Sequence, residues 1–113
     1  MLIENTGLNG LRSDLAHLDE VMSQLGFIRW QWEYYRATYD LKMETSQGDC
    51  YLRINCRAVE GKLESPHAIL QIESIYVGKA TFPHGVDYQS PLPEQVHRIT
   101  TQKLNELKRR LTA

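Results

Sequence analysis

The chain has 113 residues, a net charge of −1 and 42% hydrophobic residues. This length and composition exclude a disordered chain, and we expect residues 1–113 to form a single domain around one apolar core. The near-zero charge argues against a nucleic-acid partner, because such proteins usually carry an excess of Lys and Arg. We find no signal-peptide pattern and no apolar run of membrane-spanning length, so we expect a cytoplasmic protein with no membrane partner.

Two segments carry apolar residues at helical spacing. Leu15, Leu18 and Leu25 follow a capping residue, Ser13 or Asp14, and precede Gly26, which predicts a helix over residues 14–25. A second helix is predicted after the prolines at 91 and 93, because proline suits the first helical turn. Its apolar stripe consists of Val96, Thr100, Leu104, Leu107 and Leu111.

Between these helices, apolar and polar residues alternate, which predicts four antiparallel strands at about 28–34, 37–43, 50–58 and 67–77. A turn at Tyr35-Arg36 would place Ile28 opposite Met43 and Trp30 opposite Leu41, all on one apolar face. The pairs Trp32 with Tyr39 and Tyr34 with Ala37 follow from the same turn.

A second turn, at Gln47-Gly48, would place Leu41 opposite Ile54. It would also set Lys42 against Arg53, an unfavourable pair of like charges. The long segment from 81 to 93 is rich in Pro and Gly and is predicted to be a loop.

The predicted order is α-β-β-β-β-α, which gives an α+β fold with a four-stranded antiparallel sheet and both helices packed on one face. The expected core includes Leu18, Trp32, Leu41, Ile54, Ile72 and Leu104. The opposite face of the sheet is polar and is either solvated, a binding surface or the subunit interface of a homodimer. It is predicted to carry Arg29, Gln31, Glu33, Asp40, Lys42, Arg53, Asn55, Arg57, Gln71 and Glu73.

The two cysteines, Cys50 and Cys56, are six residues apart on one predicted strand. At ~3.3 Å per residue they are separated by roughly 20 Å, which is too far for a disulfide. We therefore expect two reduced core thiols in a reducing compartment.

Two groups of residues are candidates for a binding site. His84, Asp87 and Tyr88 gather in the predicted loop, where Gly85 favours a sharp turn. Trp30 and Trp32 belong to an aromatic cluster that either lines a pocket for a planar ligand or is part of the core. One His and one Asp fall short of a zinc ligand set, so we predict no metal and no cofactor.

Five stretches of the chain together resemble the YugN-like family, small proteins of Gram-positive spore-formers. They are Gln31-Trp32-Glu33-Tyr34, Thr38-Tyr39-Asp40-Leu41, Tyr51-Leu52-Arg53-Ile54, Ala58-Val59-Glu60-Gly61 and Pro83-His84-Gly85-Val86-Asp87-Tyr88. The resemblance covers most of the chain and implies a small cytosolic α+β domain. It assigns no activity and no catalytic residues.

The sequence contains no phosphate loop, nucleophile elbow or dinucleotide fingerprint. Our first hypothesis is a non-enzymatic module that binds an unknown ligand or protein partner. The alternative is a small metal-dependent or hydrolytic enzyme that uses the loop at residues 81–88, with His84 and Asp87 as its reactive groups. A nucleic-acid binder that uses the sheet or the basic end of the second helix is a third hypothesis.

Overall fold

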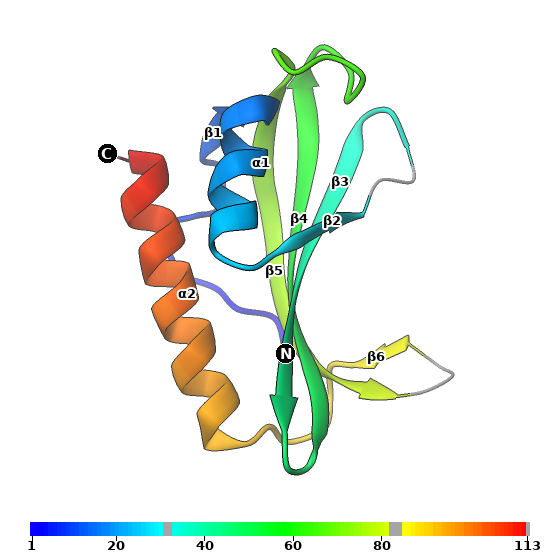
Figure 1. Cartoon of the computed structure of the whole chain (residues 1–113), viewed down its shortest axis with the longest axis vertical. Coiled ribbons are helices and arrows are strands. Elements are labelled where there is room, and N and C mark those ends of the chain that lie inside the picture. Colours follow the sequence, from blue (N-terminus) through cyan, green and yellow to red (C-terminus); the bar gives the residue numbers. More distant parts are fainter. Residues whose placement is uncertain (31–32, 82–84, 113) are drawn as a thin grey trace.

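The computed structural model describes residues 1–30, 33–81 and 85–112. It has one layer of two helices and one antiparallel sheet, which confirms the α+β class (Figure 1). The sheet has six strands in the order β1-β5-β4-β3-β2, with β6 also paired to β5. The elements are β1 (Arg12–Asp14), α1 (Leu15–Gln24), β2 (Ile28–Trp30), β3 (Arg36–Thr45), β4 (Gly48–Glu60), β5 (Ile69–Thr81), β6 (Gly85–Asp87) and α2 (Glu94–Thr112).

The predicted four-stranded sheet and its α-β-β-β-β-α order are therefore wrong. The described chain runs β-α-β-β-β-β-β-α. Sequence periodicity missed β1 and β6 because each has three residues, too few for an alternating pattern to be recognised. Both pair with the same edge of β5, β1 at residues 69–71 and β6 at residues 79–81.

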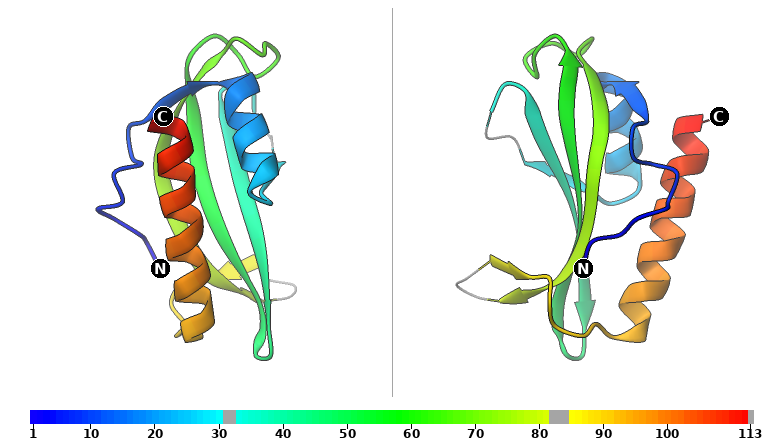
Figure 2. Two further views of the ribbon diagram at one scale, coloured as in Figure 1. Left: turned by 60° about the vertical axis from the view of Figure 1, so that its left-hand side comes forward. Right: turned by 180° about the vertical axis from the view of Figure 1, so that it is seen from behind.

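Both helices lie side by side on one face of the sheet, as predicted (Figure 2). The α1 helix begins after Asp14, whose carboxylate accepts a hydrogen bond of 2.9 Å from the backbone N–H of His17. It ends before Gly26, whose φ of +95° favours glycine. The α2 helix begins directly after Pro93. No helix in the described part of the chain is long and apolar enough to cross a membrane.

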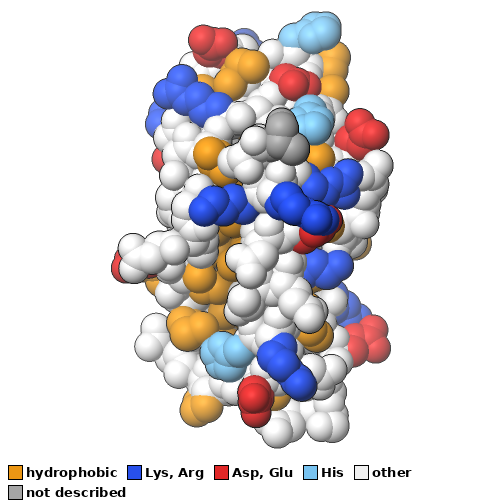
Figure 3. All heavy atoms as spheres, turned by 90° about the vertical axis from the view of Figure 1, so that its left-hand side faces the viewer, with side chains coloured by type: hydrophobic (Ala, Val, Ile, Leu, Met, Phe, Trp, Pro, Cys, Tyr) orange, Lys and Arg blue, Asp and Glu red, His pale blue; other side chains and the backbone are white. Residues whose placement is uncertain are grey.

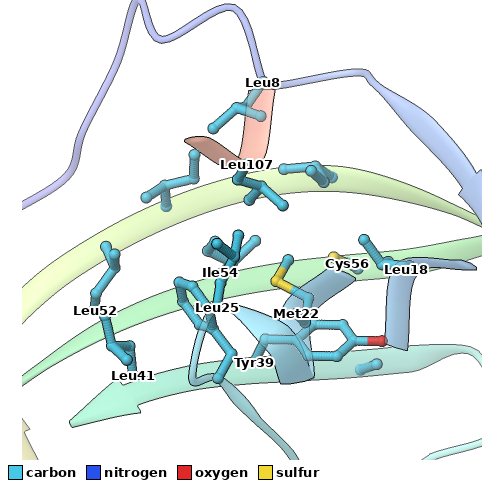
Figure 4. Close-up of a cluster of buried hydrophobic side chains, with 14 of the residues drawn as sticks. Leu8, Leu18, Met22, Leu25, Tyr39, Leu41, Leu52, Ile54, Cys56 and Leu107 are labelled. Atoms are coloured by element: carbon cyan, nitrogen blue, oxygen red, sulfur yellow. The ribbon is translucent and has the colours of Figure 1, made fainter. Parts of the chain in front are cut away.

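The core lies between the helices and the sheet (Figure 4). Ile54 of β4 is at its centre, with Leu107 of α2 above it and Met22 of α1 beside it. Five of the six predicted core residues are buried, and the sixth, Trp32, lies outside the described residues. The five are Leu18, Leu41, Ile54, Ile72 and Leu104.

The predicted register between the first two strands is wrong. Trp30 pairs with Thr38 rather than Leu41, and Ile28 pairs with Asp40 rather than Met43. Since side chains alternate between faces, this shift of three residues turns both apolar side chains away from the core. Ile28 is 64% exposed and Trp30 is 48% exposed. The expected turn, which lacked the Gly or Asn of a tight hairpin, does not form, and β2 ends at Trp30.

The next pairing is shifted by two residues from the prediction, which keeps every side chain on its predicted face. Leu41 pairs with Leu52 instead of Ile54 because Ser46-Gln47, one residue earlier than expected, forms the turn. The shift also removes the unfavourable pair of like charges. Arg53 now lies opposite Asp40, and Lys42 lies opposite Tyr51.

The β5 strand changes its buried face part-way along its length. Asn55 of β4 pairs with Ser74, whereas the next residue, Cys56, pairs with Ile72, so Glu73 is an extra residue in β5. This bulge brings both Ile72 and Ile75 to the core. Without the extra residue, Ile72 and Ile75 would lie on opposite faces of the strand.

The N-terminal segment, whose conformation the sequence left open, runs along the edge of β5. The backbone N–H of Ile3 donates to the carbonyl of Ile75 at 2.9 Å, and that of Gly10 donates to Ile72 at 2.8 Å. Leu8 is fully buried against the core. The segment therefore covers much of an edge that would otherwise leave backbone groups unpaired.

Arg29 lies on the helix side of the sheet and not on the predicted polar face, because it pairs with Tyr39. Its guanidinium lies 3.3 Å from Asp19 of α1, and the Tyr39 hydroxyl donates to the same carboxylate at 2.6 Å. Burial, together with this hydrogen bond, raises the pKa of the Tyr39 phenol. These contacts connect α1 to β2 and β3.

Both cysteines are free and buried on β4. Burial raises the pKa of the Cys56 thiol to about 12 and raises that of Cys50 as well. Because both thiols are buried and their thiolate forms are disfavoured, we expect almost no alkylation by iodoacetamide in the native protein and complete alkylation in denaturant. Intact-mass measurement after iodoacetamide treatment counts the alkylated thiols, and the same measurement with and without reductant tests for a disulfide. A two-dalton difference in the monomer would contradict the placement of both thiols on one strand.

Candidate functional site

The helices leave one face of the sheet uncovered, and we call it the open face. Two rows of directly opposed residues cross it from β2 to β5. One row is Ile28, Asp40, Arg53 and Tyr76, and the other is Trp30, Thr38, Asn55 and Ser74. Three strand spacings of about 4.8 Å place the ends of each row roughly 14 Å apart. The β5–β6 hairpin projects on this side, away from the helices (Figure 1).

A hollow of about 330 Å³ lies over these rows. We call it the aromatic hollow. Its lining combines side chains from β2, β3, β4 and β5 with one residue that follows β6. These residues are Trp30, Thr38, Asp40, Arg53, Asn55, Tyr76 and Tyr88.

An ion pair joined by two hydrogen bonds forms part of the floor of the aromatic hollow. Arg53 donates from Nε and Nη2 to the two carboxylate oxygens of Asp40, each at 2.9 Å. The Asp40 side chain is only 7% exposed, whereas that of Arg53 is 33% exposed. Hydrogen bonding to Asp40 raises the pKa of the Arg53 guanidinium above its ordinary value. The two hydrogen bonds therefore fix the two side chains relative to one another.

Tyr88 connects the wall of the hollow to this floor. Its hydroxyl accepts a hydrogen bond of 3.1 Å from Nη1 of Arg53. Its ring lies 5.2 Å from that of Tyr76, with 47° between the planes, which is a favourable tilted arrangement. Trp30 lines the hollow from β2, at the beginning of the second row.

A chain of hydrogen bonds continues across the other row. The Thr38 hydroxyl donates to Oδ1 of Asn55 at 3.0 Å, and Nδ2 of Asn55 donates to the Ser74 hydroxyl at 3.1 Å. Thr38 and Asn55 also line a neighbouring hollow of about 390 Å³, which we call the charged hollow. Its lining consists of Glu33, Arg36, Ala37, Thr38, Asn55, Cys56, Arg57, Glu73 and Ser74.

The charges in both hollows are balanced. The Arg57 guanidinium lies 2.7 Å from Glu73, and Arg36 lies 3.9 Å from Glu33. With the pair in the aromatic hollow, three Arg residues face three acidic residues. The described residues that line the two hollows therefore have no excess charge to attract a strongly ionic ligand.

The structure brings together two of the five residues that the sequence suggested. Trp30 and Tyr88 line the aromatic hollow, whereas Asp87 does not. The Asp87 carboxylate accepts hydrogen bonds from the Ser90 hydroxyl and from the backbone N–H of Gln89, at 2.8 Å for the latter. These hydrogen bonds lower the pKa of Asp87, and the bond from Ser90 has the largest effect. The other two suggested residues, His84 and Trp32, lie outside the described residues.

Sequence reasoning missed Gly78, which allows Tyr88 to reach the hollow. A β-carbon at this position would lie 2.6 Å from the backbone oxygen of Asp87, 2.6 Å from Cγ1 of Val86 and 2.8 Å from Cδ1 of Tyr88. Only glycine permits this close approach without a shift of the chain. A glycine inside a strand often marks such a close approach. Our predicted strand ended at residue 77, so Gly78 lay outside it and was not recognised.

Within residues 1–30, 33–81 and 85–112, no three His, Cys, Asp or Glu side chains are grouped as metal ligands would be. The helix side shows mixed charges, with Lys and Arg side chains gathered across its middle and upper part (Figure 3). Several basic residues of α2 have local partners. Arg109 pairs with Glu106, Arg110 contacts Gln24, and Lys103 donates to the carbonyl of Leu25 at 2.9 Å.

The comparisons with known proteins identify the family. A family model described as the YugN-like family matches residues 4–108. The chain belongs to the YugN-like family. This confirms the resemblance drawn from the five sequence stretches.

Two relatives in Bacillus subtilis (strain 168) support this assignment to the YugN-like family. The uncharacterized protein YlbA is 41% identical over 99 residues, which cover 87% of this chain and 82% of YlbA. The uncharacterized protein YugN is 31% identical over 83 residues, which cover 73% of this chain and 62% of YugN.

A solved structure from the YugN-like family has the same fold. The crystal structure of the uncharacterized conserved protein YugN from Geobacillus kaustophilus HTA426 matches with a TM-score of 0.87 and 34% identity. The match covers 99% of this chain and 95% of that chain. The names of these YugN-like proteins state no ligand and no reaction, so any function must be argued from the geometry of the open face.

Proposed function

We propose that this protein is a small non-enzymatic binding module whose ligand site is the aromatic hollow. One observation carries the proposal. The face that the helices leave uncovered has a hollow of about 330 Å³ with aromatic walls and a hydrogen-bonded polar floor. Ligand sites of this size usually combine an apolar lining with a few fixed polar groups.

The floor supports binding because its polar side chains are already ordered. Arg53 makes three hydrogen bonds, two to Asp40 and one to Tyr88. Asn55 is fixed from both sides by Thr38 and Ser74. A ligand would therefore lose little free energy to the immobilisation of these side chains.

The enzyme hypothesis has less support. It relied on His84 and Asp87, and the Asp87 carboxylate is engaged in local hydrogen bonds with Gln89 and Ser90. The nucleic-acid hypothesis is also weaker, since the arginines that line the two hollows are each beside an acidic residue. We likewise propose a cytoplasmic location, which the two free thiols support because reducing compartments keep cysteines unpaired.

A protein contact is the second candidate function. Four of the six exposed large hydrophobic side chains in the described residues lie between positions 28 and 35. They are Ile28, Trp30, Tyr34 and Tyr35. Exposed aromatic residues are frequent in protein interfaces. A protein partner or a second copy of this chain, forming a homodimer, could cover this end of the open face.

Native mass spectrometry of the protein expressed in and purified from Bacillus subtilis, the organism of two relatives, tests the proposal. We expect the wild-type protein to carry a small molecule and the Trp30→Ala variant to lose it. The matched control is Ile28→Ala, on the same strand and face but outside the hollow, which should keep the molecule. A wild-type spectrum with no added mass and two subunits would contradict the small-ligand site and favour the homodimer.

A further inference from the structure

The charge of the aromatic hollow restricts the ligand that can bind there. Among the described residues that line it, only Arg53 and Asp40 are charged, and they form one ion pair. An anionic ligand would have to compete with the Asp40 carboxylate for Arg53. A cationic ligand would meet the Arg53 guanidinium, which is about a third exposed. The balanced pair therefore disfavours a net charge of either sign.

The hydrogen-bonding groups of the floor are mainly donors. The guanidinium of Arg53 has five N–H groups, three of which are used by Asp40 and Tyr88. The Tyr88 hydroxyl accepts from Arg53, so its own hydrogen can be donated into the hollow. Asn55 uses one of its two amide hydrogens on Ser74 and its oxygen on Thr38. Four donor hydrogens on three side chains thus have no acceptor among the described residues.

The walls add a preference for flat groups. The Trp30 indole is about half exposed at one end of the hollow, and the tilted pair of Tyr76 and Tyr88 lies at the other. A flat ring contacts aromatic faces and the planar guanidinium with little loss of conformational entropy. The ligand that satisfies all three conditions is flat, uncharged and rich in hydrogen-bond acceptors.

We propose, on the basis of the proposed function, that the aromatic hollow binds an uncharged aromatic or heteroaromatic ring that carries a carbonyl-type acceptor. The acceptor meets the unused donors of Arg53, Tyr88 and Asn55, and the ring lies between the aromatic walls. Loss of the acceptor leaves these donors without a partner once water is excluded, so it weakens binding.

Three probes with one ring and different charges test the ligand class. Benzamide is neutral with a carbonyl acceptor, benzoate is anionic and benzylamine is cationic. Dissociation constants are measured by NMR titration of the full chain. We expect benzamide to bind at least about tenfold more tightly than either ion. The Tyr88→Phe variant, which keeps the ring and removes one donor, should weaken benzamide severalfold. Tyr51→Phe, on the same face but outside the hollow, should not.

Three results would overturn this inference. They are tighter binding of benzoate, tighter binding of benzylamine, or equal effects of Tyr88→Phe and Tyr51→Phe. The proposed function is tested separately by Trp30→Ala. If Trp30→Ala no longer binds a probe that the wild type binds, the aromatic hollow is the binding site, even if benzamide is not the preferred probe. If no probe binds, or if Trp30→Ala binds all three as the wild type does, both the ligand class and the site are wrong.

Discussion

Replacement of Ile54 by Ala is expected to lower the free energy of unfolding by about 2–5 kcal/mol, the usual cost of truncating a buried large aliphatic side chain. Ile54 is fully buried and is paired with Tyr39 on one side and Ile75 on the other. Leu107 of α2 lies above it (Figure 4). The truncation therefore leaves a cavity where the sheet meets both helices, and chemical denaturation measures its cost.

Two further variants make this result specific. Ile54→Val removes one methyl group and should cost about 0.5–1.5 kcal/mol. Arg57→Ala, on the same strand but the open face, removes an exposed ion pair with Glu73 and should cost at most about 1 kcal/mol. A denaturation midpoint for Ile54→Ala equal to that of the wild type would contradict the register of β4.

Replacement of Gly78 by Ala is expected to cost about 1–3 kcal/mol, as overpacking at a tight contact does. The new β-carbon would lie 2.6 Å from the backbone oxygen of Asp87, and backbone cannot move aside as a flexible side chain can. The chain after β6 must therefore shift and carry Tyr88 away from Arg53. We expect a loss of ligand affinity in the aromatic hollow in addition to the loss of stability.

A double-mutant cycle checks this explanation. If Gly78→Ala weakens binding by displacing Tyr88, the double variant Gly78→Ala/Tyr88→Ala should bind no more weakly than Tyr88→Ala alone. Additive losses in affinity would mean that Gly78 acts on the hollow by another route. Unchanged stability of Gly78→Ala would contradict the close approach of β6 to β5.

The helices and most of the core could be predicted from the sequence because their signals are local. The Asp14 cap, the Gly26 stop and the apolar stripe that includes Leu104 each depend on neighbours along the chain. The register of the strands was harder to predict than the helices and the core. It depends on comparing whole sets of pairs, and a shift of two residues keeps every side chain on the same face.

The site shows the same division. Trp30 was suggested as part of an aromatic cluster and Tyr88 as part of the predicted loop, and both line the hollow. The pair of Arg53 with Asp40 could not be found, because the predicted register set Arg53 against Lys42. The contact of Tyr88 with Arg53 depends on the β5–β6 hairpin, which periodicity did not reveal.

The location of the bound ligand tests most directly whether the aromatic hollow is the binding site. Two-dimensional ¹⁵N–¹H spectra are recorded while the full chain is titrated with whichever of the three ring probes binds most tightly. We predict that the largest shift changes occur at the backbone amides of Thr38, Arg53, Asn55 and Tyr88, with little change along α2. Changes confined to α2 or to the N-terminal segment, or no changes at all, would contradict a binding site on the open face.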